Sequence, residues 1–338
     1  MCGRTRRWPI CSTRAICPCP GSNWRSSGDR RHRALFHCPR RRALLPYVGI
    51  SHSGWSARLL PECGGSLASL HLDGAEILRT MPQGSVDPLT SACFPLVPYA
   101  NRIAGGMFAR GETKVRLPRN FPPETSSLHG FGWQDEWEIL SASTSECALE
   151  HRHPGLGPTP WPGDPTGWPW AYEAQQRVRL GRQGCVIALE VTNRSNSTMP
   201  AGLGLHPYFR RRPETRLRFA AEGVMLVDEA SIPTGMIAPP DRFGDFARGS
   251  ALPDETLDHC FAGWNGMATI EDDLGAIALT ARGAPHLHLY APADGSALCL
   301  EPVSHVPDAL NRTPVCMTAL PPGCTSGLRM WISAHPLD

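Results

Sequence analysis

Residues 172–191 read YEAQQRVRLGRQGCVIALEV, and this stretch decides the fold class. Apolar side chains occupy every second position over most of residues 172–180 and again over residues 185–191. Alternation with a period of two is typical of a strand that has one buried face, and residues 181–184, with a glycine at each end, supply a turn. The stretch therefore predicts an antiparallel β-hairpin.

Shorter runs of the same kind occur through the rest of the chain. No amphipathic helical segments of about 10–15 residues separate them, so a parallel sheet with crossover helices is not expected. The 34 prolines and 33 glycines exclude a helical bundle, because both residues interrupt helices. The sequence predicts an all-β chain, a large antiparallel β-sandwich or barrel. The runs are Ala68–Leu72, Val224–Leu226, Leu287–Leu289, Leu298–Leu300 and Leu328–Ile332.

The length and the cysteine content of the chain indicate its class and the compartment in which it works. A chain of 338 residues can bury a sizeable core without disulfides. It contains no apolar run near the roughly 18 residues of a membrane-spanning helix, so no membrane partner is expected. The 13 cysteines are odd in number and scattered without a repeated spacing. We therefore expect free thiols in a reducing compartment and a cytoplasmic protein.

Residues 1–47 differ from the rest of the chain. They hold 11 arginines against a single acidic residue, Asp29, and five of the 13 cysteines. They show neither strand nor helix periodicity and have too little apolar surface to offset the entropy cost of ordering. We expect a disordered Arg- and Cys-rich arm or a mis-annotated start, followed by one domain over residues 48–338.

Two functional readings of this arm stay open. It could bind nucleic acid, although the mildly acidic remainder of the chain gives no electrostatic reason to hold a phosphate backbone, and we expect no nucleic-acid partner. It could also hold zinc through Cys11, Cys17, Cys19, His37 and Cys38. The Cys17-Pro-Cys19 spacing is tighter than the paired spacings of zinc ribbons, which weakens this second reading.

Deletion of residues 1–46 should leave folding and activity intact, because the composition of this segment contributes little to a buried core. Thermal melting of the shortened and full-length chains checks the expectation. A large drop in melting temperature on deletion would show that the arm is structural.

Common catalytic signatures are missing from the sequence. It has no complete dinucleotide fingerprint, no phosphate-binding loop and no nucleophile elbow, and no cofactor is expected. The pairs His151/His153 and His286/His288 would each place two imidazoles on one strand face, as in some all-β metalloenzymes. The polar face of an exposed strand gives the same pattern and no third ligand is indicated, so we expect no metal.

Five short polar clusters remain, set in β-type sequence. In chain order they are Asn101-Arg102-Ile103, Ser127-Leu128-His129-Gly130, His206-Pro207-Tyr208-Phe209, Asp258-His259-Cys260-Phe261, and the long run from Leu300-Glu301-Pro302 to Asn311. Together and in this order they resemble the aldose 1-epimerase (galactose mutarotase-like) family. The resemblance covers the chain from about Val48 to its C-terminus.

This resemblance implies a fold and an activity. The fold is the large antiparallel β-sandwich called the galactose mutarotase-like supersandwich. The activity is an isomerase reaction in carbohydrate metabolism, the interconversion of the α and β anomers of a free aldohexose without a cofactor. In the family, the glutamate at the position of Glu301 takes the proton of the C1 hydroxyl, and the histidine at the position of His206 protonates the ring oxygen. At substrate-binding positions stand Arg102, His129 and Asp258.

Acid–base chemistry supports this division of roles. Opening a hemiacetal needs a base at one oxygen and an acid at the other, and each positioned proton transfer contributes about 10²–10⁴-fold in rate. Near neutral pH we expect Glu301 ionised and His206 protonated, since a nearby carboxylate raises the pKa of an imidazole.

The alternatives concern the substrate and whether catalysis occurs. Arg210, Arg211 and Arg212 directly follow the last residue of the His206 cluster and could bind a phosphate, as in a hexose-phosphate 1-epimerase. Altered residues around both catalytic positions would also suit a non-catalytic carbohydrate-binding protein. The sequence leaves the natural sugar and the oligomeric state open. Trp133, Trp137, Tyr208 and Trp264 are candidates to pack against a sugar ring.

Overall fold

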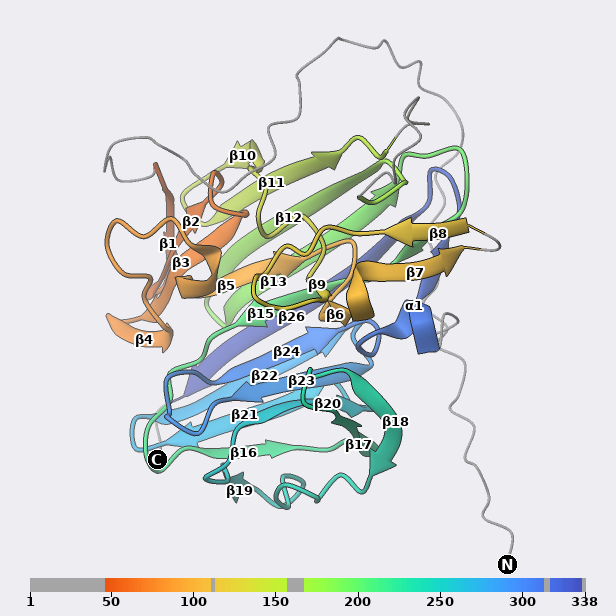
Figure 1. Cartoon of the computed structure of the whole chain (residues 1–338). Coiled ribbons are helices and arrows are strands. Elements are labelled where there is room, and N and C mark those ends of the chain that lie inside the picture. Colours follow the sequence, from red (N-terminus) through yellow and green to blue (C-terminus); the bar gives the residue numbers. More distant parts are fainter. Residues whose placement is uncertain (1–45, 111–112, 157–166, 313–316, 336–338) are drawn as a thin grey trace, which may run out of the picture.

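The computed structural model describes residues 46–110, 113–156, 167–312 and 317–335 (Figure 1). Apart from residues 46 and 47, the predicted arm lies outside this part of the chain. The first described strand, β1, begins at Val48. In the described residues the elements are almost all strands, with one short α-helix, α1 (Ala309–Arg312), and two 3₁₀ turns, η1 (Pro88–Thr90) and η2 (Ala104–Gly106).

Two large antiparallel sheets dominate the fold, and the first has 11 strands. In spatial order these are β1 (Val48–His52), β2 (Trp55–Leu60), β3 (Ser66–Leu72), β5 (Cys93–Leu96), β15 (Gly204–Pro207), β24 (Cys299–Val303), β23 (His286–Ala291), β20 (Leu257–Ala262), β17 (Gly223–Val227) and β18 (Pro233–Ala238), with β4 (Ala75–Leu78) paired to β3.

The second sheet has nine strands, and three short two-stranded pairs complete the described structure. The order in the second sheet is β10 (Glu138–Ala142), β11 (Glu146–His153), β12 (Tyr172–Gly181), β13 (Gly184–Asn193), β26 (Thr325–His335), β22 (Gly275–Arg282), β21 (Met267–Asp272), β16 (Arg216–Phe219) and β19 (Ser250–Ala251). The small pairs are β6 (Arg102–Ile103) with β9 (Ser127–Leu128), β7 (Met107–Arg110) with β8 (Thr113–Arg116), and β14 (Met199–Ala201) with β25 (Thr318–Leu320).

The predicted hairpin is confirmed as β12 and β13. The two strands pair antiparallel from Tyr172 opposite Asn193 to Gly181 opposite Gly184. The alternate apolar side chains of both strands are buried, and they join a core cluster that also contains the buried leucines of the 11-stranded sheet. Since each sheet buries one face in this shared core, the predicted antiparallel sandwich is the observed architecture.

The same alternation gives the 11-stranded sheet a second, polar face. Leu205, Leu287 and Leu300 are fully buried and belong to the shared core. The residue that follows each of them points to the opposite side of the sheet, because successive side chains of a strand alternate between faces. That outer face also carries a smaller hydrophobic cluster, which is separate from the main core and includes Phe94 and Tyr208.

Leu189→Ala should lower the free energy of unfolding by about 2–5 kcal/mol, because a fully buried leucine is lost and a cavity remains. Urea denaturation measures the loss. The matched control is Glu190→Ala on the exposed face of the same strand, with an expected change within about 0.5 kcal/mol. Equal effects of the two substitutions would contradict the assignment of Leu189 to the core.

The structure bears on two earlier expectations, one about membrane-spanning helices and one about free cysteines. No helix in the described ranges is long and apolar enough to span a membrane. Six cysteines in these ranges carry free, buried thiols, namely Cys63, Cys93, Cys147, Cys185, Cys260 and Cys299. Cys324, in contrast, is disulfide-bonded, so the expectation of free thiols throughout is wrong at this position.

Candidate active site

One row of side chains crosses the outer face of the 11-stranded sheet over β5, β15, β24, β23 and β20. Figure 1 shows these five strands in the middle of the view. Phe94 of β5 lies opposite His206 of β15. On β24, Glu301 lies opposite His288 of β23, which in turn lies opposite Cys260 of β20. Pairing of Gly204 with Val303 sets β15 against β24, and this register brings His206 next to Glu301. Five strands from distant parts of the sequence thus build one row.

His206 and Glu301 are in direct contact. Nε2 of His206 lies 3.1 Å from Oε1 of Glu301, and the two side chains are only 8% and 2% exposed. The imidazole lies against two aromatic rings, with ring centroids 4.5 Å from Phe94 and 4.7 Å from Tyr208, and is nearly parallel to both. These rings restrict the orientation of the imidazole and so hold Nε2 toward the carboxylate.

Each member of the pair also has a buried polar atom with no hydrogen-bond partner in the described part of the chain. These atoms are Oε2 of Glu301 and Nδ1 of His206. Buried polar atoms of native proteins are nearly always paired, and an unpaired one calls for an explanation such as a catalytic role, an ion or a water molecule. These two atoms belong to an ionisable pair, which fits a catalytic role.

Burial sets the protonation of this pair. It lowers the pKa of His206 to about 3 and raises the pKa of Glu301 to about 8, since an apolar surrounding disfavours both charged forms. Near neutral pH the pair therefore holds one proton, and burial places it on the carboxyl group. The expectation of an imidazolium beside a carboxylate is therefore wrong for the free site, although that form holds the same number of protons. It differs only in the position of one proton across the 3.1 Å contact.

His129 stands beside His206, with ring centroids 5.4 Å apart and perpendicular planes. Its Nδ1 accepts a hydrogen bond from the backbone N–H of Asn101 at 3.0 Å. Burial lowers the pKa of His129 well below its ordinary value, so the ring is neutral and carries its proton on Nε2. His129 therefore offers a single N–H donor to the site.

The backbone is strained at two positions of the site, Asn101 and His129, and the last sequence cluster ties down the segment around Asn101. Both His129 and Asn101 have positive φ angles, 59° and 58°. Nε2 of His305 accepts a hydrogen bond from the backbone of Ala100, and Oδ1 of Asp308 accepts one from Ala104. Unfavourable backbone angles at functional positions persist only where surrounding contacts hold them, and these bonds provide such contacts.

Arg102 is held by two carboxylates. Its Nε and Nη2 donate to the two oxygens of Glu124 at 2.9 and 2.8 Å, and Nη1 donates to Oδ2 of Asp258 at 3.3 Å. A two-point contact of this kind fixes the plane of the guanidinium. Glu124 belongs to the connection between β8 and β9, and it is the most exposed of the three side chains, at 26%.

Asp258 links Arg102 to His288. Its Oδ1 lies 2.7 Å from Nε2 of His288. Burial alone would raise the pKa of Asp258, but the hydrogen bond and charge of His288, together with Arg102, hold that pKa well below its usual range. Burial likewise opposes the charge on His288, yet its hydrogen bond to Asp258 prevails and raises the pKa of His288 to about 10. His288 is therefore a cation at neutral pH.

The metal reading of the two His-x-His pairs gains no support. His288 binds Asp258, whereas His286 on the same strand face accepts a hydrogen bond from the backbone of Gly263. His151 binds Asp135. Within the described ranges no three His, Cys, Asp or Glu side chains are grouped as a metal ion requires.

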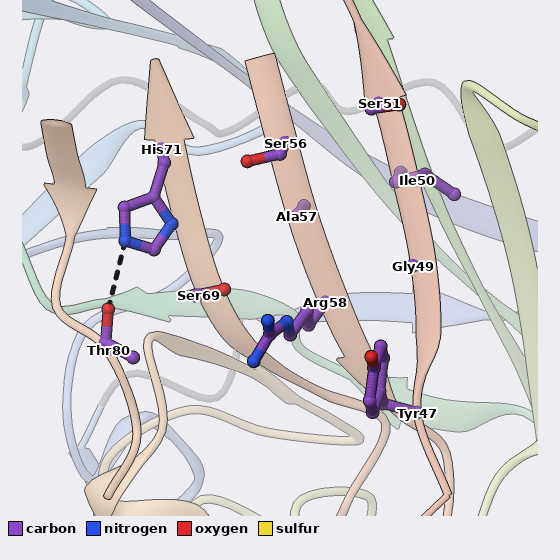
Figure 2. A pocket seen from close by; sticks show the side chains of 10 residues that line it. All are labelled: Tyr47, Gly49, Ile50, Ser51, Ser56, Ala57, Arg58, Ser69, His71 and Thr80. Atoms are coloured by element: carbon purple, nitrogen blue, oxygen red, sulfur yellow. Dashed lines mark hydrogen bonds between the residues drawn. The ribbon is translucent and has the colours of Figure 1, made fainter. Parts of the chain in front are cut away.

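Two cavities lie outside the row. One of them lies over β1, β2 and β3 and has a volume of about 420 Å³. Figure 2 shows the side chains that line it. Its lining includes the small residues Gly49, Ser56 and Ser69. Figure 2 shows a hydrogen bond between His71 and Thr80, whose Nε2 and Oγ1 atoms lie 3.1 Å apart. No acid–base pair lines it.

The second cavity, of about 430 Å³, is lined by Arg210, Arg211 and Arg212. Arg210 donates to both oxygens of Asp272, and Arg212 makes a two-point contact with Asp273. Arg211 donates to two backbone carbonyl groups. Each of these arginines thus has partners within the protein itself.

The structure brings all five sequence-predicted residues into one cluster on the outer face. It also adds side chains to which sequence reasoning gave no role there, namely Phe94, Asn101, Glu124 and His288. Of the four aromatic candidates, Tyr208 stacks on His206 and Trp133 stacks on Phe94. Trp137 and Trp264 instead belong to the main core.

Comparison with known proteins agrees with this fold. The family model described as aldose 1-epimerase matches residues 50–333. The uncharacterised protein YphB of Escherichia coli (strain K12) is 31% identical over 259 residues, which cover 74% of this chain and 85% of that protein. A second uncharacterised protein of Escherichia coli (strain K12), YihR, is 24% identical over 259 residues, which cover 73% of this chain and 80% of that protein.

Solved structures give the same result. A crystal structure from Escherichia coli K12, of a protein with a provisional aldose 1-epimerase name, superposes with a TM-score of 0.78 at 29% identity, covering 86% of this chain and 99% of that one. A galactose mutarotase-like protein from Clostridium acetobutylicum shares the fold with a TM-score of 0.72 at 20% identity, covering 86% and 95% of the two chains. The chain described here belongs to the aldose 1-epimerase family.

Proposed function

We propose that the protein is an aldose 1-epimerase that interconverts the α and β anomers of a free aldohexose, with Glu301 and His206 as the catalytic pair. Family and fold support a mutarotase-like carbohydrate epimerase with a sugar substrate. The finer proposal rests on the buried contact between His206 and Glu301, whose Nε2 and Oε1 atoms are 3.1 Å apart. The other oxygen of Glu301 is also buried and has no hydrogen-bond partner in the described part of the chain.

The chemistry needs one proton removed and one delivered. Glu301, as carboxylate, accepts the proton of the C1 hydroxyl while His206, as imidazolium, gives its proton to the ring oxygen. The bond between C1 and the ring oxygen breaks, and an open-chain aldehyde forms. Rotation about the C1–C2 bond presents the other face of the aldehyde, and the same two groups then close the ring in reverse.

The protonation of the pair suits this cycle. One proton is held in common, so moving it from Glu301 to His206 generates the reactive form without exchange with solvent. Polar oxygens of a bound sugar favour this transfer, because they solvate the two charges that burial otherwise disfavours. The pair ends each ring opening with its proton on Glu301, ready for the reverse transfer.

Three neighbours are assigned to sugar binding. His129 offers its Nε2–H to a sugar oxygen, and Asp258 accepts from sugar hydroxyls through a carboxylate that stays ionised. Arg102, held by Glu124 and Asp258, directs its remaining N–H groups toward the ring oxygen side and hydroxyls. Ionised partners form strong, directional hydrogen bonds to hydroxyls, which favours a defined sugar orientation.

Polarimetry of freshly dissolved α-D-glucose and α-D-galactose tests the proposal directly. The protein should accelerate the change in optical rotation above the spontaneous rate, with no added cofactor or metal. Acceleration of a hexose 6-phosphate alone would point to the hexose-phosphate alternative. Sugar binding measured by calorimetry, without acceleration of any of the three sugars, would overturn the proposal in favour of a carbohydrate-binding protein.

A further inference from the structure

His288 is the buried ionisable group that the catalytic scheme leaves without a role. It lies in the row directly opposite Glu301 on the neighbouring strand, on the outer face of the sheet. Residues directly opposite one another in an antiparallel pair have Cβ atoms about 4.5–5.5 Å apart. The side chain is 4% exposed, so its interactions are screened little by solvent.

One charged contact fixes the imidazole, because its Nε2 donates to Oδ1 of Asp258 at 2.7 Å. The amide nitrogen of Asn101 lies 3.4 and 3.3 Å from the two ring nitrogens, and since an amide N–H and an imidazolium N–H both donate, it packs against the ring without a hydrogen bond. The short contact to a carboxylate is typical of a charge-assisted hydrogen bond from an imidazolium. Asn101 is in turn held by the strained loop that carries Arg102.

The surroundings make His288 the main positive charge that Glu301 experiences. The charged and titratable groups that face the two side chains are Asp258 and Cys260 from β20, His206 from β15, Cys299 from β24, Arg102 from β6, Tyr208 and His129. Burial keeps His129 and His206 neutral, and it keeps Cys260, Cys299 and Tyr208 protonated, through shifts of their pKa values. Among the charged groups, His288 lowers the pKa of Glu301 most, Asp258 raises it, and Arg102 lowers it less.

We propose that His288 is a positioning residue of this site, which holds the Asp258 carboxylate toward the sugar and provides the fixed positive charge beside Glu301. The inference rests on the proposed epimerase function. The role of His288 is electrostatic, because the imidazolium favours the ionised form of Glu301 and so counteracts the burial of the base.

The test compares His288→Gln with His286→Gln in the pH dependence of kcat/KM. A catalytic pair that works with one proton gives a bell-shaped profile, which falls on the acid side as the pair gains a second proton. Loss of a nearby cation raises the pKa of both members of the pair, so His288→Gln should move both limbs to higher pH, and the alkaline limb, where Glu301 loses the shared proton, by about one unit or more. His286→Gln changes the same strand face two residues away, where there is no contact to Asp258, and should leave the profile in place.

The outcomes separate a charge effect from a structural one. A uniform loss of activity in His288→Gln without movement of either limb would overturn the proposal, since a packing defect alone does not shift the profile. A shift of the alkaline limb in His286→Gln of the same size would also overturn it.

A second measurement does not depend on activity or on a variant. In protein labelled with ¹⁵N-histidine, a buried imidazole should keep the nitrogen shifts of the charged form above pH 8. Absence of such a signal would contradict the fixed charge, whether or not the protein epimerises sugars. Lack of acceleration in the polarimeter, with the charged signal present, would instead contradict the proposed function.

Discussion

Glu301→Gln should reduce kcat for anomer interconversion by about 10²–10⁴-fold, because the carboxamide cannot take the C1 hydroxyl proton. It keeps the size of the side chain and the possibility of a hydrogen bond to His206. We therefore expect sugar binding and thermal stability to change little, and the loss to appear in kcat and not in KM. Polarimetry gives the rates, and calorimetric titration gives the affinity for the sugar.

The matched control is Glu190→Gln. This glutamate is exposed on β13, in the sheet that does not carry the site. Its replacement removes the same charge and should leave kcat unchanged. A Glu301→Gln protein that is folded and retains the parent rate would exclude Glu301 as the base.

His206→Asn should cause a loss of similar size, about 10²–10⁴-fold in kcat, because the donor to the ring oxygen is removed. The double variant His206→Asn/Glu301→Gln is the more informative protein. Groups that act as one unit give strongly non-additive effects. Since the two side chains share one proton, the double variant should lose little more than the slower single variant.

If the loss in kcat of the double variant equalled the product of the two single losses, this expectation would be wrong. It would mean that the acid and the base act in separate steps with separate protons. Circular dichroism of all three variants has to match that of the parent, since Phe94 and Tyr208 both pack against the imidazole of His206.

Much of the fold could be predicted from alternation alone. The hairpin of residues 172–193 shows its buried face in the sequence, and its short turn leaves one choice of register. The order of the five polar clusters along the sequence predicted the family, and the comparison with known proteins confirms it. The five expected site residues came from that resemblance, and the structure brings them together.

The neighbours of those residues could not be predicted in the same way. His288 reads in the sequence as half of a His-x-His pair, and only the order β24-β23-β20 reveals Glu301 on one side of it and Asp258 on the other. Glu124 lies in a connection without periodicity, so nothing local ties it to Arg102. A signal for the row did exist, because Leu205-His206, Leu287-His288 and Leu300-Glu301 share one apolar–polar step.

The adjacent placement of one core residue and one site residue in a strand constrains which changes in chain length the protein can tolerate. In β24, Leu300 contributes to the core and the adjacent Glu301 to the outer row. An insertion or deletion of one residue within the strand would exchange the two, placing a carboxylate in the core and a leucine beside His206. Stability and catalysis would fail together. We therefore expect changes in length to be tolerated in the connections between strands and not within β24.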